Sequence, residues 1–211
     1  MGLLNSFQKK PTQASAKKTL SYSIGNIDTI IRDSDKVIAA CQKADAEYNK
    51  DHDLDKRLAV YEKYFLKKPE WNGFNFCLSL ATMYVKSGQN DKAWGYLNQL
   101  FIWTIEPGPI NGYAYKVRYE QFKILKSEKR FKDAMVMLVS SNILNSEAMV
   151  KPYFNKDKFL KDAKTTAKGI GFSEDSLEEF ANRLEKGIIS KNLKDSTAQR
   201  FCSDYYNYID V

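Results

Sequence analysis

Apolar residues recur with a helical period along most of this chain, and the pattern is clearest between residues 76 and 100. Two helical segments meet there at Gly88, which supplies a tight turn. Ala81 and Ala93 stand where the two helices would cross, so the helices can approach closely. Larger apolar side chains surround these two positions: Leu80, Tyr84, Leu97 and Leu100. One such pair cannot bury its apolar face alone, so we expect neighbouring pairs to stack on it.

The same spacing predicts one helical pair before this one and another after it. The earlier pair has a first helix from Ile27 to Tyr48 and a second helix that Asp53 caps and Pro69 ends. Asn90 or Asp91 is expected to cap the second helix of the central pair. The stripes of the flanking pairs are Leu54, Leu58, Tyr61 and Phe65; Tyr115, Tyr119, Phe122 and Leu125; and Phe131, Ala134, Met135, Leu138 and Val139.

Residues from about 145 to 211 do not follow the spacing of the three pairs, but their apolar residues keep a helical period. Gly169 or Gly171 is expected to end one helix, and Ser173 or Ser176 to begin the next. Apolar stripes follow at Phe159, Ala163 and Ala167; at Leu177, Phe180, Ala181, Leu184 and Ile188; and at Ala198, Phe201, Cys202, Tyr205 and Ile209. No stretch favours a β-strand. We therefore predict an all-α fold with a basic flexible tail at 1–20, stacked helical pairs at 21–145 and a helical cap at 146–211 that packs on the pairs.

The three pairs resemble tetratricopeptide (TPR) repeats, which are helical pairs of 34 residues with fixed large and small positions. The central pair, 74–107, matches best, while Arg57 and Phe122 replace small residues of the motif in the other two. The matching residues are Leu80, Ala81, Tyr84, Gly88 and Ala93; then Tyr48, Tyr61 and Pro69; then Phe131, Ala134 and Leu138. The resemblance implies a right-handed superhelical stack whose first helices line a concave groove. A related α-solenoid could show the same spacing.

Carrying the groove positions of that family onto this sequence gives a surface of lysines and amides without an acid. Its residues are Gln42, Asn49, Lys50, Asn75, Leu78, Thr82, Lys86, Lys116, Tyr119, Lys123 and Lys126. Such a surface suits an acidic peptide or a terminal carboxylate, through charge-assisted hydrogen bonds. We expect a non-enzymatic interaction scaffold or adaptor with an acidic protein partner. The carboxylate clamp of chaperone-binding TPR proteins is not reproduced, because only Lys116 fits its positions.

The net charge of +7 and the pI near 9.1 favour anionic partners in general. The first twenty residues contain four lysines and no acid, and their start matches an N-myristoylation pattern beside a weak apolar anchor of Leu3, Leu4 and Phe7. Seven Lys or Arg residues lie between 116 and 132, with tyrosines among them. The alternative function is therefore an accessory protein that associates with nucleic acid or with a membrane surface.

No continuous apolar leader and no apolar run long enough to span a bilayer is visible, so we expect a cytoplasmic protein. The three cysteines, Cys41, Cys77 and Cys202, are far apart and lie in helical patterns, which indicates buried free thiols.

Catalytic and metal-binding signals are weak. Asp51, Asp53, Asp55 and Glu62 have the spacing of a calcium loop, but Lys56 replaces its glycine, so helix capping is the better interpretation. His52 is the only histidine and has no serine or cysteine beside it to activate. We expect no catalytic residue, metal or cofactor.

Overall fold

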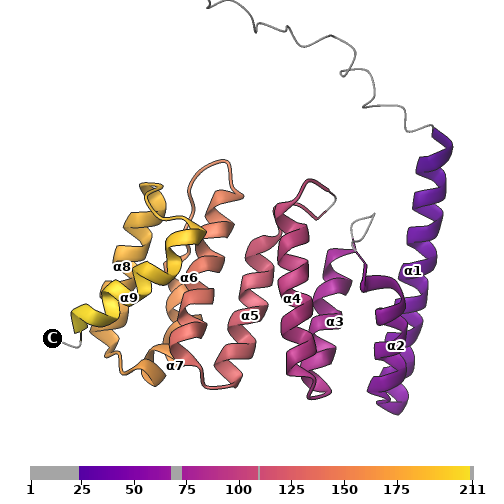
Figure 1. Ribbon diagram of the computed structural model, residues 1–211, viewed down its shortest axis with the longest axis horizontal. Coiled ribbons are helices and arrows are strands. Elements are labelled where there is room, and N and C mark those ends of the chain that lie inside the picture. Colours follow the sequence, from indigo (N-terminus) through magenta and orange to yellow (C-terminus); the bar gives the residue numbers. More distant parts are fainter. Residues whose placement is uncertain (1–23, 68–72, 109, 210–211) are drawn as a thin grey trace, which may run out of the picture.

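The computed structural model describes residues 24–67, 73–108 and 110–209 (Figure 1). Within these ranges the chain forms α-helices and one short 3-10 turn, with no β-strand. The predicted all-α class is confirmed for this part of the chain. The predicted tail at 1–20 and the helix-ending Pro69 lie outside the described residues.

The elements follow one another in a simple order. The helices are α1 (Ile24–Asp51), α2 (Leu54–Phe65), α3 (Phe74–Lys86), α4 (Asn90–Ile105), α5 (Ala114–Ser127), α6 (Phe131–Glu147), α7 (Lys156–Ile170), α8 (Glu174–Ile189) and α9 (Ala198–Ile209). The 3-10 turn η1 (Asp195–Thr197) lies between α8 and α9.

Three of the described helices begin at a side chain that accepts a backbone hydrogen bond. Asp53 accepts from the N–H of Lys56 at 3.0 Å and begins α2, as the sequence predicts. Ser173 accepts from the N–H of Ser176 at 3.0 Å and begins α8, which decides between the two predicted serines. Asn155 caps α7 in the same way. These caps satisfy N–H groups that the first helical turn leaves without partners.

The predicted cap of α4 is wrong. Neither Asn90 nor Asp91 precedes this helix; the preceding residue is Gln89, which makes no side-chain cap bond. The amide of Asn90 instead donates to the carboxylate of Glu128 at 3.1 Å, which ties the start of α4 to the end of α5. The predicted turn at Gly88 is confirmed, since this residue has φ +74°, a conformation that glycine adopts without strain.

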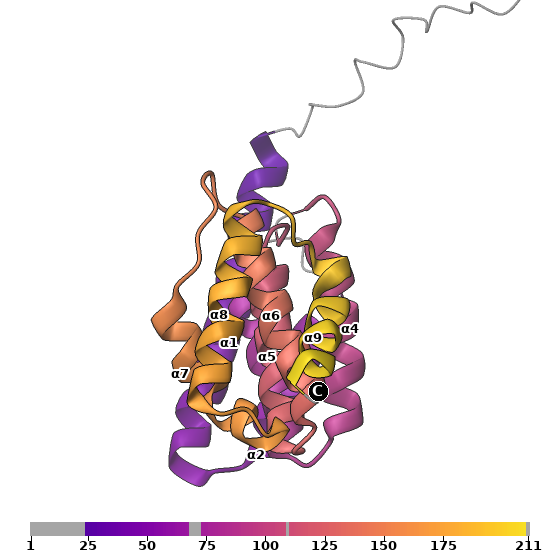
Figure 2. The ribbon, with the colours of Figure 1, turned by 90° about the vertical axis from the view of Figure 1, so that its left-hand side faces the viewer.

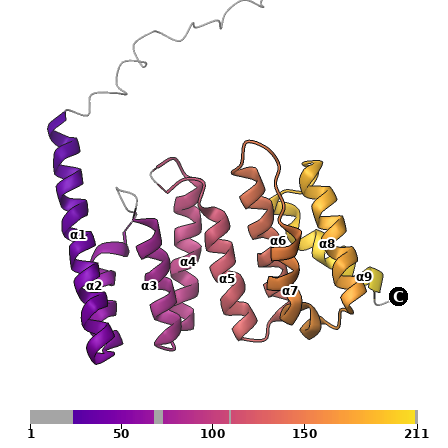
Figure 3. The same ribbon diagram turned by 180° about the vertical axis from the view of Figure 1, so that it is seen from behind.

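Successive helices pack in pairs, α1 on α2, α3 on α4, α5 on α6 and α7 on α8. Adjacent pairs join through contacts of α2 with α3, α4 with α5, and α6 with α7. Figure 1 shows the pairs side by side in one row, and Figure 3 shows α1, α3, α5 and α7 on the near side of that row. Seen from one end, α7 and α8 lie on one flank and α4 and α9 on the other (Figure 2).

The small residues of the central pair are buried where α3 meets α4. Ala93 is 0% exposed and Ala81 is 1% exposed. Both belong to a core cluster with the predicted large neighbours Leu80, Tyr84, Leu97 and Leu100. A short side chain at both positions lets the helices approach closely enough to bury this cluster.

The core consists of two clusters that meet in α5. Val117 and Ile124 of this helix belong to the cluster that extends back to α1, whereas Phe122 and Leu125 belong to the cluster that extends forward to α9. The predicted stripes of α7 and α8 are buried in the second cluster, from Phe159 to Ile188. Helix α5 therefore holds the two halves of the row together.

Five residues that the sequence places on apolar stripes are only partly buried: Leu54, Tyr115, Tyr119, Phe131 and Phe201. The side of α5 that carries Tyr115 and Tyr119 borders a hollow instead of a helix. This side is therefore open to solvent.

The segment after α8 is fastened to the middle of the row. The guanidinium of Arg118 on α5 lies 3.7 Å from the ring centroid of Phe101 and 3.5 Å from the carboxylate of Asp195 in η1. The hydroxyl of Ser140 on α6 donates to the same carboxylate. Helix α9 then packs on α6. None of the described helices combines the length and the apolar character needed to cross a bilayer.

Candidate functional site

Two hollows adjoin one another along α5, between α3 and the segment that leads into α7. The larger has a volume of about 410 Å³ and is lined by Leu78, Tyr115, Lys116, Tyr119, Glu120, Ser141, Asn142, Asn145, Tyr153, Asn155 and Lys158. The smaller has a volume of about 170 Å³ and is lined by Ala81, Thr82, Val85, Leu97, Glu120, Lys123, Ile124 and Ser127. Glu120 borders both hollows, so they form one track along the helix, which we call the α5 track.

The α5 track contains five of the eleven residues that the sequence places in a groove. They are Leu78, Lys116 and Tyr119 in the larger hollow, and Thr82 and Lys123 in the smaller one. The other six line neither hollow: Gln42, Asn49 and Lys50 on α1, Asn75 and Lys86 on α3, and Lys126 on α5. The residues on α1 are exposed at the far end of the row.

Tyr119 lies at the centre of the α5 track, between two ammonium groups. The Nζ atom of Lys158 is 4.6 Å from the centroid of its ring, and that of Lys123 is 5.8 Å away. Burial raises the pKa of the Tyr119 hydroxyl, and a hydrogen bond with Asp162 raises it further. Tyr119 is therefore a neutral, aromatic surface held in place by its charged neighbours.

Lys116 is the cation of the α5 track that no carboxylate neutralises. Its Nζ atom lies 5.0 Å from the ring centroid of Tyr113 and 5.8 Å from that of Phe74. It has no ion-pair partner among the described residues, whereas Lys123 pairs with Glu120 at 2.6 Å and Lys158 pairs with Asp162 at 2.6 Å. Lys116 is thus the lysine best placed to receive a carboxylate from another molecule.

Most polar side chains of the larger hollow bond within the chain. The Ser141 hydroxyl donates to the carbonyl of Tyr115 at 2.8 Å, and the Asn142 amide donates to that of Leu138 at 2.8 Å. The side chain of Asn145 differs from these two, because it has no hydrogen-bond partner among the described residues. An incoming peptide could bond this amide without displacing an internal bond.

The α5 track contains one acid that is not among the predicted groove positions. Glu120 contributes to both hollows and lies against Lys123, which lowers the positive charge of the smaller one. Among the lining residues the balance is three lysines, Lys116, Lys123 and Lys158, against this one glutamate. The α5 track remains basic, but only mildly so.

Sequence reasoning missed the far wall of the larger hollow. Asn142 and Asn145 come from α6, Tyr153 and Asn155 come from the segment that leads into α7, and Lys158 lies in the first turn of α7. Groove positions were assigned only to the first helix of each pair. A wall formed by a second helix and by the segment between α6 and α7 was therefore not predicted. The cap signal of Asn155 could have located the start of α7, but not its distance from α5.

The basic residues between 116 and 132 do not form one uniform patch. Arg118 lies between Phe101 and Asp195, as described above, and is only partly exposed. Arg130 pairs with Asp133 at 2.8 Å. Several of these cations are therefore occupied by contacts within the chain, which leaves less charge for a phosphate backbone than the sequence suggests.

The acidic residues with calcium-loop spacing have other roles. Lys56 lies 2.8 Å from the carboxylate of Asp53 and 3.4 Å from that of Asp51. Asp53 also caps α2. The described residues contain no group of three or more His, Cys, Asp or Glu side chains that could hold a metal ion.

The three cysteines are buried and free, as the sequence predicts. Burial raises the pKa of the thiols, to about 11 for Cys41 and Cys77 and to about 12 for Cys202. At neutral pH these thiols are protonated and shielded from solvent, which disfavours their use as nucleophiles.

Comparisons with known proteins add no information about this site. No protein-family model, no curated protein and no solved structure matches this chain.

Proposed function

We propose that this chain is a non-enzymatic interaction scaffold, which binds an extended, acidic or carboxylate-ended segment of another protein along the α5 track. The observation that carries the proposal is the unneutralised Lys116 in an open hollow of about 410 Å³ lined by three tyrosines. This volume lies in the range of sites that hold a specific ligand group. The alternative, an accessory protein on nucleic acid, has weaker support because several cations of the basic stretch are already paired.

The shape of the α5 track suits a peptide chain. The larger hollow offers the rings of Tyr115, Tyr119 and Tyr153 to an apolar side chain, and the smaller one continues past Glu120 toward α3. An extended chain places alternate side chains about 7 Å apart, so one segment could occupy both hollows. Lys116 would receive a carboxylate, and Asn145 a peptide group.

The TPR-like interpretation supports this proposal. Buried Ala81 and Ala93, the turn at Gly88 and the pairwise packing are features expected of such a repeat. In a TPR-like superhelix the first helices of successive pairs form the concave surface that holds partners. The α5 track lies between first helices α3 and α5, and the wall from α6 and the α7 connection closes its end.

The test begins with a displayed library of random peptides selected on the full chain. We expect the selected peptides to share an acidic residue or a free carboxyl terminus beside an apolar residue. Affinities are then measured by fluorescence anisotropy with labelled synthetic copies. Because a charge-assisted hydrogen bond contributes about 1.5–3 kcal/mol, Lys116→Glu should weaken binding roughly tenfold or more.

Two controls make the result specific. Lys43→Glu on α1 makes the same charge change on a lysine that is 78% exposed at the far end of the row, and should leave affinity unchanged. Thermal unfolding confirms that both variants fold. Equal affinity of the wild type and Lys116→Glu, or an equal loss in both variants, would refute binding along the α5 track.

A further inference from the structure

Exposed aliphatic side chains gather at one edge of the row of helices. Ile102 and Ile105 lie in the last turn of α4, Met149 and Val150 follow α6, and Ile189 ends α8. Each is at least 45% exposed, and Val150 reaches 101%. We call these five residues the apolar edge. Large apolar side chains at this exposure contribute little to the core, so their grouping needs another explanation.

The opposite edge has a different composition. The turns within the pairs lie there, and their residues include His52 and Asp53, Gly88 and Gln89, and Lys129 and Arg130. None of the large hydrophobic residues that are exposed in the described chain lies in these turns. The two edges therefore differ in chemistry, although both consist of helix ends and connections.

Four lysines lie beside the apolar edge and form no ion pair there. Lys151 follows Val150, Lys186 lies one turn before Ile189, and Lys191 and Lys194 follow it. None of these four ammonium groups has an ion-pair partner among the described residues. The nearby acids in sequence are Glu106, Glu147, Glu185 and Asp195, and Asp195 pairs with Arg118. The edge thus combines exposed aliphatic groups with lysines that form no ion pair within the described chain.

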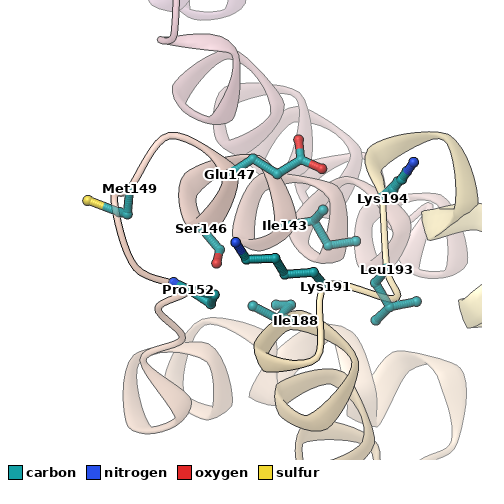
Figure 4. Close-up of a pocket in the computed structure, with 9 residues that line it drawn as sticks. All are labelled: Ile143, Ser146, Glu147, Met149, Pro152, Ile188, Lys191, Leu193 and Lys194. Atoms are coloured by element: carbon teal, nitrogen blue, oxygen red, sulfur yellow. The ribbon is translucent and has the colours of Figure 1, made fainter.

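Figure 4 shows the part of this edge between α6 and α8. Lys191 and Lys194 come from the connection after α8, and Met149 points away from the hollow that they border. The hollow has a volume of about 260 Å³ and an apolar floor that includes Ile143 and Ile188. Its lysines stay near the surface, and Met149 projects beyond it.

The exposed groups are placed to meet a flat partner. The ends of α4, α6 and α8 lie toward the same side of the molecule in Figures 1, 2 and 3. They come from separate helices across the row, so no single groove connects them. The start of α1 points to this side as well, and residues 1–23, which join the chain there, contain four lysines and no acid.

We propose that the apolar edge rests on the surface of an anionic lipid bilayer. Aliphatic side chains at helix ends enter the interface between headgroups and acyl chains, while lysines contact the phosphate and carboxylate groups of the lipids. A bilayer is flat, anionic and receptive to scattered aliphatic groups, which matches each feature of the edge. The described chain only lies on the bilayer, since none of its helices could span one.

This orientation leaves the α5 track accessible. The track lies along the sides of α3 and α5, whereas the apolar edge lies at helix ends. The chain could therefore hold a partner segment while it is attached to lipid. Failure of either proposal leaves the other intact.

The experiment is co-sedimentation of the full chain with vesicles of phosphatidylcholine, with or without phosphatidylserine. We expect binding that requires phosphatidylserine and decreases as salt is added. Two double variants test the edge: Ile105→Asp with Val150→Asp, and Lys191→Glu with Lys194→Glu. Each should weaken binding by about tenfold or more, because several groups near the surface act together. All four positions are exposed, so the fold should persist.

A matched control carries Lys43→Glu and Lys164→Glu, which make the same charge change on helix sides away from the edge. It should bind like the wild type once the fold is checked by circular dichroism. The proposal is overturned if the wild type ignores phosphatidylserine, or if the edge variants bind as well as the control. It is also overturned if reversing the lysines at 9, 10, 17 and 18 abolishes binding while the edge variants retain it.

Discussion

Replacement of Ala93 by leucine tests the packing that the whole row depends on. Ala93 is 0% exposed and faces the cluster that contains Ala81, Tyr84 and Leu97. Leucine adds three carbon atoms at a point where two helices are in close contact. Burial of those atoms alone would stabilise the fold by about 0.8 kcal/mol each, or roughly 2.4 kcal/mol in total.

The space to accept these atoms is missing, so steric cost should outweigh the gain. Overpacked cores lose about 1–3 kcal/mol net, and a helix contact at a small residue has little freedom to adjust. We therefore expect Ala93→Leu to lower the free energy of unfolding by about 2 kcal/mol. If the site had space for the added atoms, Ala93→Leu would instead raise the free energy of unfolding by about 2 kcal/mol.

The assay is urea unfolding followed by circular dichroism, with Ala59→Leu as the matched control. Ala59 lies on the exposed side of α2, where the same change should alter stability by less than about 0.5 kcal/mol. Both residues are helical, so differences in helix propensity cancel. If Ala93→Leu is as stable as Ala59→Leu, or more stable than the wild type, α3 and α4 are not in close contact at this point.

Three further predictions concern single features. Ser173→Ala removes the cap of α8 and should cost about 1 kcal/mol in urea unfolding, whereas Ser203→Ala on the exposed side of α9 should cost less. The three buried thiols should react with a thiol-specific disulfide reagent at pH 8 only as fast as the chain unfolds; rapid reaction of the folded chain would contradict their burial. Burial, with the charge of Asp195, raises the pKa of Glu147 above 4.5, so the folded state holds this proton more tightly and loses stability as pH rises through its titration. Glu147→Gln should thus gain stability relative to the wild type at neutral pH but not at acid pH, and a pH-independent difference would contradict this.

Sequence periodicity was sufficient to predict the helical pairs, because a helix that buries one side carries apolar residues at a regular spacing. The stripe from Leu177 to Ile188 on α8 is an example, and every predicted member is buried. Capping is less certain, because a side chain that could cap can bond elsewhere. Asn90 shows this, since its amide bonds Glu128 across the space between α4 and α5.

The division of the core at α5 could not be read from the sequence. Phe122 and Ile124 are both apolar and close in the chain, yet they belong to different clusters. A helix that is buried on two sides shows one broad stripe of apolar residues. Only the positions of the neighbouring helices decide which of these residues join which cluster. The same reason hides the wall formed by Asn145 and Tyr153, whose approach to α5 depends on the path between α6 and α7.

Backbone amide chemical-shift mapping by nuclear magnetic resonance tests the central claim most directly. The full chain is titrated with the peptide that the displayed library returns. The account predicts shifts concentrated on α3, α5, the second half of α6 and residues 153–158, with Lys116 and Asn145 among the most affected. Shifts centred on α1, on α9 or on the turns within the pairs would contradict binding along the α5 track.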